Sequence, residues 1–216
     1  DTLQMDKSAA CKRITFGNAS AQFAYQTDSH NEFAGITFSN ASGSFAVQSN
    51  LSGSFNCTNL GAAATIGLYF DVPATAIAEA LSNYVPAMNR VEWRVTARNK
   101  VLLDAYNANP TSMSLSIENF AKWHKDGWLV LGDMFELGEE SAIEHQAIVE
   151  LVQRTNMEER CILVGKHFGG TAWQGLQFAT TEDLETFWKE NGAPKDAAIL
   201  LKGSRGIALE QLLTLL

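Results

Sequence analysis

Three short segments of the chain place hydrogen-bonding side chains directly after a run of apolar residues. Residues 101–113 read VLLDAYNANPTSM, residues 129–138 read LVLGDMFELG, and residues 199–206 read ILLKGSRG. The side chains that follow the apolar runs are carboxylates, a phenol, carboxamides, a hydroxyl and cations, and such groups bind sugar hydroxyls, phosphates and carboxylates. A loop that only turned the chain could be built from glycine and serine, so the three segments predict a ligand-binding site.

Each polar residue taken alone has a structural explanation, whereas their shared position favours a site. Asn109 suits a helix cap, Gly138 suits a turn, and Lys202 suits a short loop. If the apolar runs are parallel strands of one sheet, their carboxyl ends meet at one edge, which is where such sheets bind ligands. The candidate residues at this edge are Asp104, Tyr106, Asn107, Asn109, Asp133, Lys202, Ser204 and Arg205.

A regular alternation of strands and helices, which begins near residue 87, positions these segments. Short apolar runs predict strands, and apolar residues at helical spacing predict helices. Such alternation forms right-handed βαβ units, so we expect an α/β, Rossmann-like domain with a mostly parallel sheet. The predicted strands are residues 90–96, 100–106, 127–134, 160–165, 176–179 and 197–203, and the predicted helices are residues 110–123, 181–192, 206–216 and one that begins at Ser141.

Two of these helices carry signals for their first turn. Asn109 followed by Pro110 predicts an N-cap and a first helical residue. The expected apolar face of that helix is Met113, Ile117, Phe120 and Ala121. The sequence SAIE predicts a capping box that begins at Ser141, and the expected apolar stripe is Ile143, Ala147, Leu151 and Val152. His145 lies off that stripe, which favours an exposed histidine over a general base.

The first 86 residues have a different composition. Residues 14–55 are rich in Ser, Asn, Gly and Phe, and four short stretches between residues 12 and 49 predict strands joined by turns. Residues 56–72 and 73–85 then predict two helices, and Pro86 closes the second. We therefore expect two domains, residues 1–86 and residues 87–216.

Composition and charge exclude several functional classes. The chain has 16 Lys and Arg against 24 Asp and Glu, a net charge of −8, which argues against a general nucleic-acid binder. The local group Arg90, Arg94, Arg98 and Lys100 leaves room for a nucleotide site, although most of it suits a solvated edge strand. The three cysteines show no metal-ligand spacing and fit a reducing compartment, and no apolar run is long enough to span a bilayer. We expect a cytoplasmic protein without a metal site of its own.

Five motifs in order give the chain a resemblance to a known family. They are GSFNCTNLGAAA at residues 53–64, NRVE at 89–92, DAYNANPTSM at 104–113, GDMFELG at 132–138 followed by His145, and LLKGSRG at 200–206. Together they resemble the Mur ligases, and among them the MurF type, which adds D-alanyl-D-alanine to a UDP-N-acetylmuramoyl tripeptide with ATP. Phe55 departs from the family pattern, which often has histidine at this position.

The resemblance implies a role for each candidate residue. The implied ATP-binding residues are Asn56 and Asn59 at adenine, Arg90 at the phosphates, Asp104 at the ribose, and Tyr106. A carboxylate suits a ribose because its two oxygens can accept hydrogen bonds from a cis-diol. The implied acceptor-binding residues are Asn107, Asn109, Asp133, Lys202, Ser204 and Arg205, with Lys202 or Arg205 at the dipeptide carboxylate. No catalytic residue and no metal ligand is assigned within this chain.

The resemblance also implies that the chain is part of a longer ligase. It contains no GxxxxGK[ST] phosphate loop and lacks the upstream residues that hold Mg²⁺ in the family. Residues 1–86 then correspond to the tail of the ATP-binding central domain and residues 87–216 to the C-terminal domain. We expect a monomer that is inactive alone, with ATP and Mg²⁺ as cofactors and UDP-MurNAc-tripeptide and D-alanyl-D-alanine as substrates of the intact enzyme.

Two alternatives are left open by the sequence. One is a non-catalytic, Rossmann-like module that binds a nucleotide or a peptide. The other is a sister amino-acid ligase of the diaminopimelate-adding or folylpolyglutamate type. Those ligases typically have a histidine in the loop where this chain has Asn107, which favours the MurF type.

Overall fold

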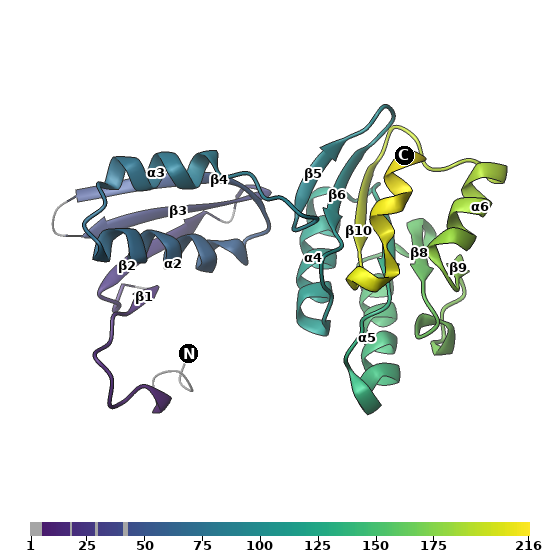
Figure 1. Cartoon of the computed structure of the whole chain (residues 1–216), viewed down its shortest axis with the longest axis horizontal. Helices are drawn as coiled ribbons and strands as arrows, with labels where there is room; N and C mark the ends of the chain where they lie inside the picture. Colours follow the sequence, from purple (N-terminus) through teal and green to yellow (C-terminus); the bar gives the residue numbers. More distant parts are fainter. Residues whose placement is uncertain (1–5, 18, 29, 41–42) are drawn as a thin grey trace. The chain divides into compact units, whose positions relative to one another are not determined.

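The chain divides into two compact units, which are described separately. A computed structural model describes residues 6–17, 19–28, 30–40 and 43–216. Residues up to Tyr84, apart from Leu51–Gly53, form the first unit. Leu51–Gly53 and Val85–Leu216 form the second unit (Figure 1).

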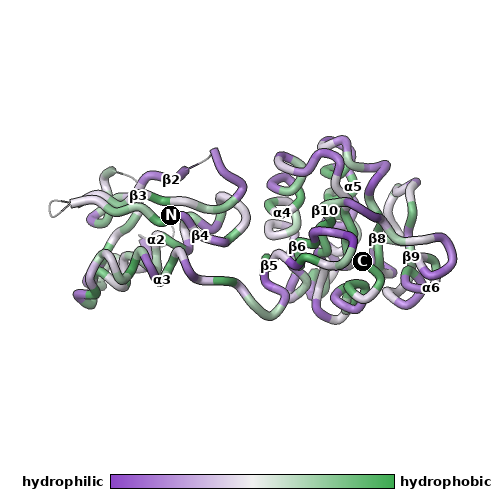
Figure 2. The backbone as a smooth tube through the Cα atoms, turned by 90° about the horizontal axis from the view of Figure 1, so that it is seen from above, coloured by the Kyte–Doolittle hydropathy of each residue, from purple (hydrophilic) through white to green (hydrophobic). Residues whose placement is uncertain are grey.

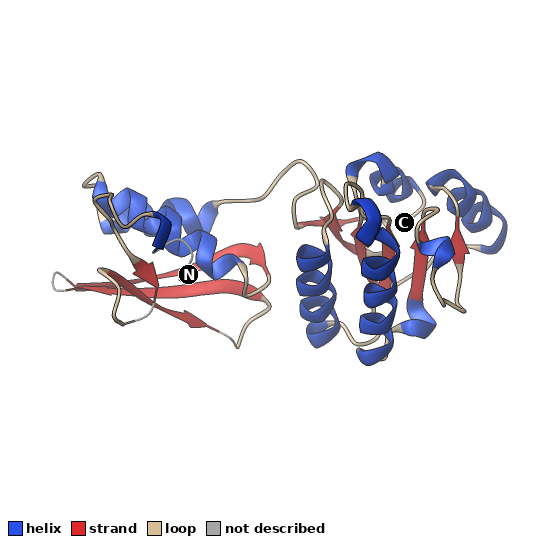
Figure 3. Cartoon of the chain, turned by 90° about the horizontal axis from the view of Figure 1, so that it is seen from below, coloured by secondary structure: helices blue, strands red, loops and turns tan. Residues whose placement is uncertain are grey.

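The first unit is a small sheet with two helices on one of its faces, as Figure 3 shows. The strands lie in the order β1-β2-β3-β4, with β1 parallel to β2 and β2 antiparallel to β3. Both the strands and the helices agree with the sequence prediction. The elements are β1 (Phe16–Gly17), β2 (Phe23–Asp28), β3 (Phe33–Asn40), β4 (Gly43–Ser52), α2 (Asn56–Tyr69) and α3 (Ala74–Asn83).

The second unit is built on a six-stranded sheet. Its strands are β5 (Glu92–Val95), β6 (Lys100–Asp104), β7 (Trp128–Gly132), β8 (Cys161–Val164), β9 (Gln177–Phe178) and β10 (Ala198–Lys202). They lie in the order β5-β6-β10-β7-β8-β9. Every neighbouring pair is parallel except β5 and β6, which are antiparallel. The predicted α/β domain with a mostly parallel sheet is confirmed.

Three α-helices and several 3₁₀ turns connect these strands. The helices are α4 (Pro110–Trp123), α5 (Ser141–Arg154) and α6 (Thr181–Asn191), and the turns are η1 (Gly138–Glu140), η2 (Glu158–Arg160), η3 (Phe168–Gly170), η4 (Arg205–Ile207) and η5 (Leu209–Thr214). The helix predicted over residues 206–216 is present as two 3₁₀ helices, η4 and η5, and not as one continuous helix. Ala208 between them has a left-handed backbone with φ of 59°, which a right-handed helix cannot continue through.

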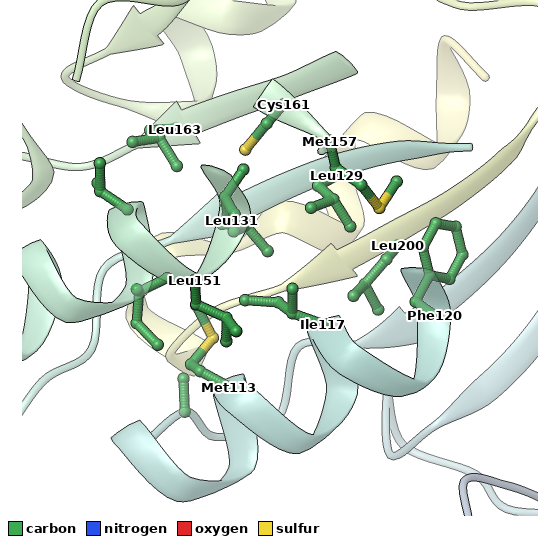
Figure 4. Packing of buried hydrophobic residues seen from close by; sticks show 14 of the residues in the cluster. Met113, Ile117, Phe120, Leu129, Leu131, Leu151, Met157, Cys161, Leu163 and Leu200 are labelled. Carbon is green, nitrogen blue, oxygen red and sulfur yellow. The ribbon is translucent and has the colours of Figure 1, made fainter. Parts of the chain in front are cut away.

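Helices cover both faces of this sheet, so the central strands are buried on both sides (Figure 3). Along β10, Leu200 packs with α4 and α5, whereas Ile199 and Leu201 pack with α6 and η5. Figure 4 shows the first of these clusters, in which Met113, Ile117 and Phe120 of α4 point toward the strands. Strands buried on both faces read as continuous apolar runs, which explains the largely hydrophobic central strands in Figure 2.

The start of α4 follows the sequence prediction. Asn109 is the N-cap with Pro110 as the first helical residue, and its side chain accepts a hydrogen bond from the Ser112 backbone N–H at 2.9 Å. The Asn109 backbone N–H in turn donates to Ser112 Oγ at 3.1 Å. This reciprocal pair fixes the turn that leads from the end of β6 into the helix.

The predicted capping box of α5 is wrong, and of its predicted apolar stripe only Leu151 and Val152 are buried. Glu140 is the N-cap and makes no side-chain capping bond. Ile143 is 73% exposed, and Ala147 is also exposed. The buried face consists of His145, Ile148, Val149, Leu151 and Val152. The helix is therefore rotated from the expected orientation, because the 3₁₀ turn η1 precedes it and a histidine takes the first buried position.

We expect the substitution Asn109→Ala to destabilise the second unit by about 1 kcal/mol, because an alanine cannot accept the Ser112 N–H. Chemical denaturation of the wild type and the variant measures this. The two free energies of unfolding are compared with the same dependence on denaturant concentration. Thr111→Ala is the matched control, since Thr111 is an exposed residue of the same helical turn. Equal stability of the Asn109 and Thr111 variants would show that the cap contributes nothing.

Candidate functional site

The three polar segments lie together at the carboxyl edge of the second sheet. Asp104 is the last residue of β6, Lys202 is the last residue of β10, and the two are paired in the strand register. Asp133 directly follows β7, which is the other neighbour of β10, and its backbone N–H donates to Val164 O at the end of β8. The expectation that these three residues share one edge is confirmed.

A buried ion pair occupies the centre of this edge. Lys202 Nζ lies 2.6 Å from Asp104 Oδ2, and Ser116 Oγ of α4 donates to the same oxygen at 2.8 Å. The Lys202 side chain is 1% exposed and that of Asp104 is 12% exposed. Within the described part of the chain, Asp104 Oδ1 has no hydrogen-bond partner. One carboxylate oxygen is thus fixed by two donors, and the other is open.

Two arginines lie against the ring of Tyr106, two residues after Asp104. The guanidinium carbon of Arg90 is 3.7 Å from the ring centroid, and that of Arg205 is 5.5 Å from it. Both arginines are exposed, and neither forms an ion pair with a carboxylate among the described residues. Contacts with an aromatic face hold a guanidinium without neutralising it, so both cations are free to bind an anionic ligand.

The backbone that carries Arg90 has an unusual conformation. Met88, Asn89 and Val91 have positive φ angles of 59°, 60° and 52°. A β-branched residue such as valine rarely adopts this region, and strained residues of this kind concentrate at functional sites. The Ala105 N–H donates to Asn89 O at 3.0 Å, which ties this segment to the end of β6.

Asp133 organises backbone and does not face solvent. Its two carboxylate oxygens accept the backbone N–H groups of His167 at 2.9 Å and Phe168 at 3.0 Å, and the residue is 2% exposed. A side chain at Gly165, which has φ of 130°, would overlap this carboxylate. The aspartate therefore holds the loop after β8 against the loop after β7.

His145 is buried, so its prediction as an exposed residue is wrong. Its Nδ1–H donates to Ser141 O at 2.7 Å, and its Nε2 accepts the Met134 N–H at 3.0 Å. These two bonds require a neutral imidazole with the proton on Nδ1. Burial lowers the pKa of His145, and the Ser141 carbonyl and Asp133 oppose that shift. The histidine connects α5 to the loop that follows β7.

The remaining acceptor-binding candidates divide by exposure. Ser204 is buried, and its Oγ accepts the Phe135 N–H at 2.9 Å. Asn107 and Asn109 are exposed, although Asn109 also caps α4. Arg205 is exposed beside Tyr106. The acceptor-binding role stays a prediction for the whole set, and the geometry favours Asn107 and Arg205 over the buried Asp133, Lys202 and Ser204.

The two adenine candidates lie in the first unit, at the start of α2. Phe55 is the N-cap of α2, and Asn56 is the first helical residue. Asn59 Nδ2 donates to Asn56 Oδ1 at 3.0 Å. Asn56 is buried and Asn59 is exposed, which leaves Asn59 the more accessible of the two carboxamides.

The side chains of the described residues do not form a site that suits Mg²⁺. Among the residues that the structure describes, no three His, Cys, Asp or Glu side chains are grouped in a way that could hold a metal ion.

The described helices include none that is both long and apolar enough to cross a membrane. Cys11, Cys57 and Cys161 are free thiols.

Ser116 and His145 are the buried polar residues of this edge whose contacts the sequence analysis missed. Ser116 lies among Met113, Ile117 and Phe120 on the buried face of α4. A polar residue inside an apolar helical stripe is a signal that it satisfies a buried partner. His145 carries the same signal, because it stands at helical spacing from Ile148 and Val152.

Comparisons with known proteins give a family match and a set of relatives. The family described as Mur ligase, glutamate ligase domain, matches residues 89–205. A UDP-N-acetylmuramoyl-tripeptide--D-alanyl-D-alanine ligase from Escherichia coli K12 is 35% identical over 166 residues, which cover 74% of this chain and 36% of that protein. The ligase of the same name from Bacillus subtilis is 32% identical over 172 residues, covering 74% of this chain and 37% of that protein.

Solved structures show the same fold over the whole chain. MurF from Acinetobacter baumannii aligns with a TM-score of 0.77 at 23% identity, over 97% of this chain and 48% of that chain. MurF from Thermotoga maritima, determined in complex with ADP, aligns with a TM-score of 0.77 at 19% identity, over 100% of this chain and 51% of that chain. The chain thus spans little more than a third of the curated relatives and about half of these structures.

The buried neutral state of His145 makes the stability of the second unit pH-dependent. The unfolded histidine binds a proton near its ordinary pKa of 6.5, whereas the folded one resists protonation because its pKa is lowered. Its contribution to stability is therefore complete above about pH 6.5 and is lost as the pH falls toward the folded pKa. Relative to His145→Gln, the wild-type free energy of unfolding should fall by up to about 1.4 kcal/mol per pH unit in that window.

Denaturation at closely spaced pH values from neutral to mildly acidic measures this difference. The comparison with His145→Gln removes the contributions that the two proteins share. A difference between wild type and His145→Gln that does not change with pH would contradict the buried neutral imidazole.

Proposed function

Because the chain belongs to the Mur ligase family, we propose that it is the C-terminal part of an ATP-dependent amide-bond ligase. The acceptor that we propose is D-alanyl-D-alanine, and the second substrate is UDP-MurNAc-tripeptide, as in the names of relatives about 30–35% identical to it. The observation that carries the proposal is the group at the carboxyl edge of the sheet. There an open carboxylate oxygen of Asp104 lies two residues from Tyr106, which holds two unpaired guanidiniums.

The nucleotide side of the proposal rests on Asp104, Arg90 and Tyr106. Asp104 Oδ1 is free to accept a hydrogen bond from a ribose hydroxyl, because Lys202 and Ser116 both bind the other carboxylate oxygen, Oδ2. Arg90 presents an exposed guanidinium for the phosphates, and its guanidinium carbon lies over the Tyr106 ring, 3.7 Å from the ring centroid. Asn56 and Asn59 are the proposed adenine contacts. ATP supplies the phosphoryl group that activates a carboxylate for amide formation, and these residues bind and orient it.

The acceptor side of the proposal rests on exposed residues. Arg205 is the proposed partner of the dipeptide carboxylate, since it is exposed whereas Lys202 is buried in an ion pair. Asn107 and Asn109 are exposed near the same strand end and can hydrogen-bond a peptide. Asp133, Ser204 and Lys202 then contribute indirectly, because they fix the loops that carry the exposed groups.

Other parts of the ligase must supply the remaining chemistry. The sequence has no GxxxxGK[ST] loop, and the described residues do not fit Mg²⁺, so no step of the reaction is assigned to a metal held by this chain. We propose that residues 1–86 are the tail of the central ATP-binding domain and residues 87–216 the C-terminal domain. The intact enzyme is proposed to be a cytoplasmic monomer, which suits free thiols and a UDP-linked substrate.

Substitutions of the two arginines that contact Tyr106 should raise the KM values of different substrates. In the intact ligase that contains this chain, Arg90→Ala should raise the KM for ATP about ten-fold or more, because a charge-assisted hydrogen bond contributes roughly 1.5–3 kcal/mol. Arg205→Ala should raise the KM for D-alanyl-D-alanine by a similar factor and leave the KM for ATP unchanged. Arg154→Ala, at an exposed position in the last turn of α5, is the matched control.

Phosphate release with each substrate varied in turn measures these constants. The same assay distinguishes the alternatives for the whole protein. Turnover with single amino acids in place of the dipeptide would identify a sister ligase. ATP binding without any turnover would identify a non-catalytic module, and turnover by the 216-residue chain alone would refute its assignment as an incomplete part.

A further inference from the structure

We propose that Ser116 and Lys202 are positioning residues that hold the Asp104 carboxylate so that its second oxygen accepts a ribose hydroxyl of the nucleotide. The inference rests on the proposed function of the same edge, and it adds two residues that the sequence motifs did not identify as nucleotide determinants. Neither residue is proposed to touch the nucleotide. Ser116 is 5% exposed and Lys202 is 1% exposed.

The geometry divides the carboxylate into a fixed oxygen and an open oxygen. Lys202 Nζ at 2.6 Å and Ser116 Oγ at 2.8 Å both contact Oδ2. The three groups come from three elements, β10, α4 and β6. The terminal torsion of an aspartate is broad, so an unrestrained carboxylate would turn easily between its two faces. Two donors from different directions remove this freedom, and Oδ1 alone is presented.

Lys202 has a second effect, through its charge. A polyphosphate carries several negative charges, and a lone carboxylate near it would be repelled. The Lys202 ammonium neutralises Asp104, so the pair can approach a nucleotide without this cost. Arg90 beside Tyr106 then adds the positive charge that attracts the phosphates. Asp104 thus keeps its hydrogen-bond acceptor while the edge as a whole stays favourable to an anion.

Ser116 allows the clearest test, because it carries no charge. Its loss leaves the Lys202–Asp104 ion pair in place and removes one of the two donors to Oδ2. A serine that only stabilised the packing of α4 would, when replaced, weaken every nucleotide to the same extent. A serine that orients Asp104 would weaken only those nucleotides that have a ribose hydroxyl for Oδ1.

The experiment compares the dissociation constants of ATP and 2′,3′-dideoxy-ATP in the intact ligase that contains this chain. The wild type should bind ATP about ten-fold or more tightly than the dideoxy analogue, as expected for a hydrogen bond to a charged acceptor. Ser116→Ala should reduce this ratio several-fold and leave the affinity for the dideoxy analogue unchanged. Ser114→Ala, whose Oγ donates to Pro110 O in the same helix, should keep the wild-type ratio.

A double-mutant cycle ties the effect to Asp104. In an Asp104→Asn protein the selectivity for ATP should already be reduced, and adding Ser116→Ala should change it no further. Lys202→Met should reduce the selectivity as Ser116→Ala does. If the methionine variant fails to fold because Asp104 loses its partner, the Ser116 cycle decides the question without it.

Three outcomes would overturn the inference. They are a wild type that does not distinguish the two nucleotides, a Ser116→Ala protein with the wild-type ratio, and an equal loss for both nucleotides in that variant. The selectivity does not depend on the acceptor, so failure of the proposed function is recognised separately. A protein with the predicted Ser116 dependence that forms no product with D-alanyl-D-alanine would support the inference and refute the acceptor assignment.

Discussion

The buried ion pair between Lys202 and Asp104 is the interaction on which the candidate site depends. It joins the last residues of β6 and β10, two neighbouring inner strands of the sheet, and both side chains are largely removed from water. A buried ammonium or carboxylate without its partner is strongly destabilising, so neither group can move without the other. The pair therefore fixes the position of Asp104 and the start of the loops that carry Tyr106 and Arg205.

The polar edge has two layers with different tasks. The buried layer consists of groups whose hydrogen bonds are satisfied within the protein, such as Asp133 with two backbone amides and His145 with Ser141 O and the Met134 N–H. The exposed layer includes Arg90, Arg205, Asn107 and Asn109, together with one oxygen of Asp104. Loops that are already ordered let a ligand bind without the entropy cost of ordering them. The buried residues therefore assist binding by holding the loops, although they do not contact the ligand.

The sequence predicted the elements well where a single local rule decides them. Strands buried on both faces read as apolar runs, and Asn109 with Pro110 marks the start of α4. It failed where a tertiary contact decides. The phase of α5 depends on the burial of His145, and its spacing from Ile148 and Val152 indicates the buried face only when histidine is allowed among the apolar residues. The left-handed Ala208, which divides the C-terminal segment into two turns, has no local signal. Asp104, Asp133 and Lys202 could be placed at one edge because each ends or follows an inferred parallel strand, but the pairing of Lys202 with Asp104 could not be predicted.

A structure of the intact ligase with a bound, non-hydrolysable ATP analogue tests the central claim most directly. The account predicts a ribose hydroxyl within hydrogen-bond distance of Asp104 Oδ1, while Lys202 Nζ and Ser116 Oγ stay on Oδ2. A nucleotide whose ribose lies away from Asp104, or an Asp104 that turns from Lys202 toward the ligand, would contradict it.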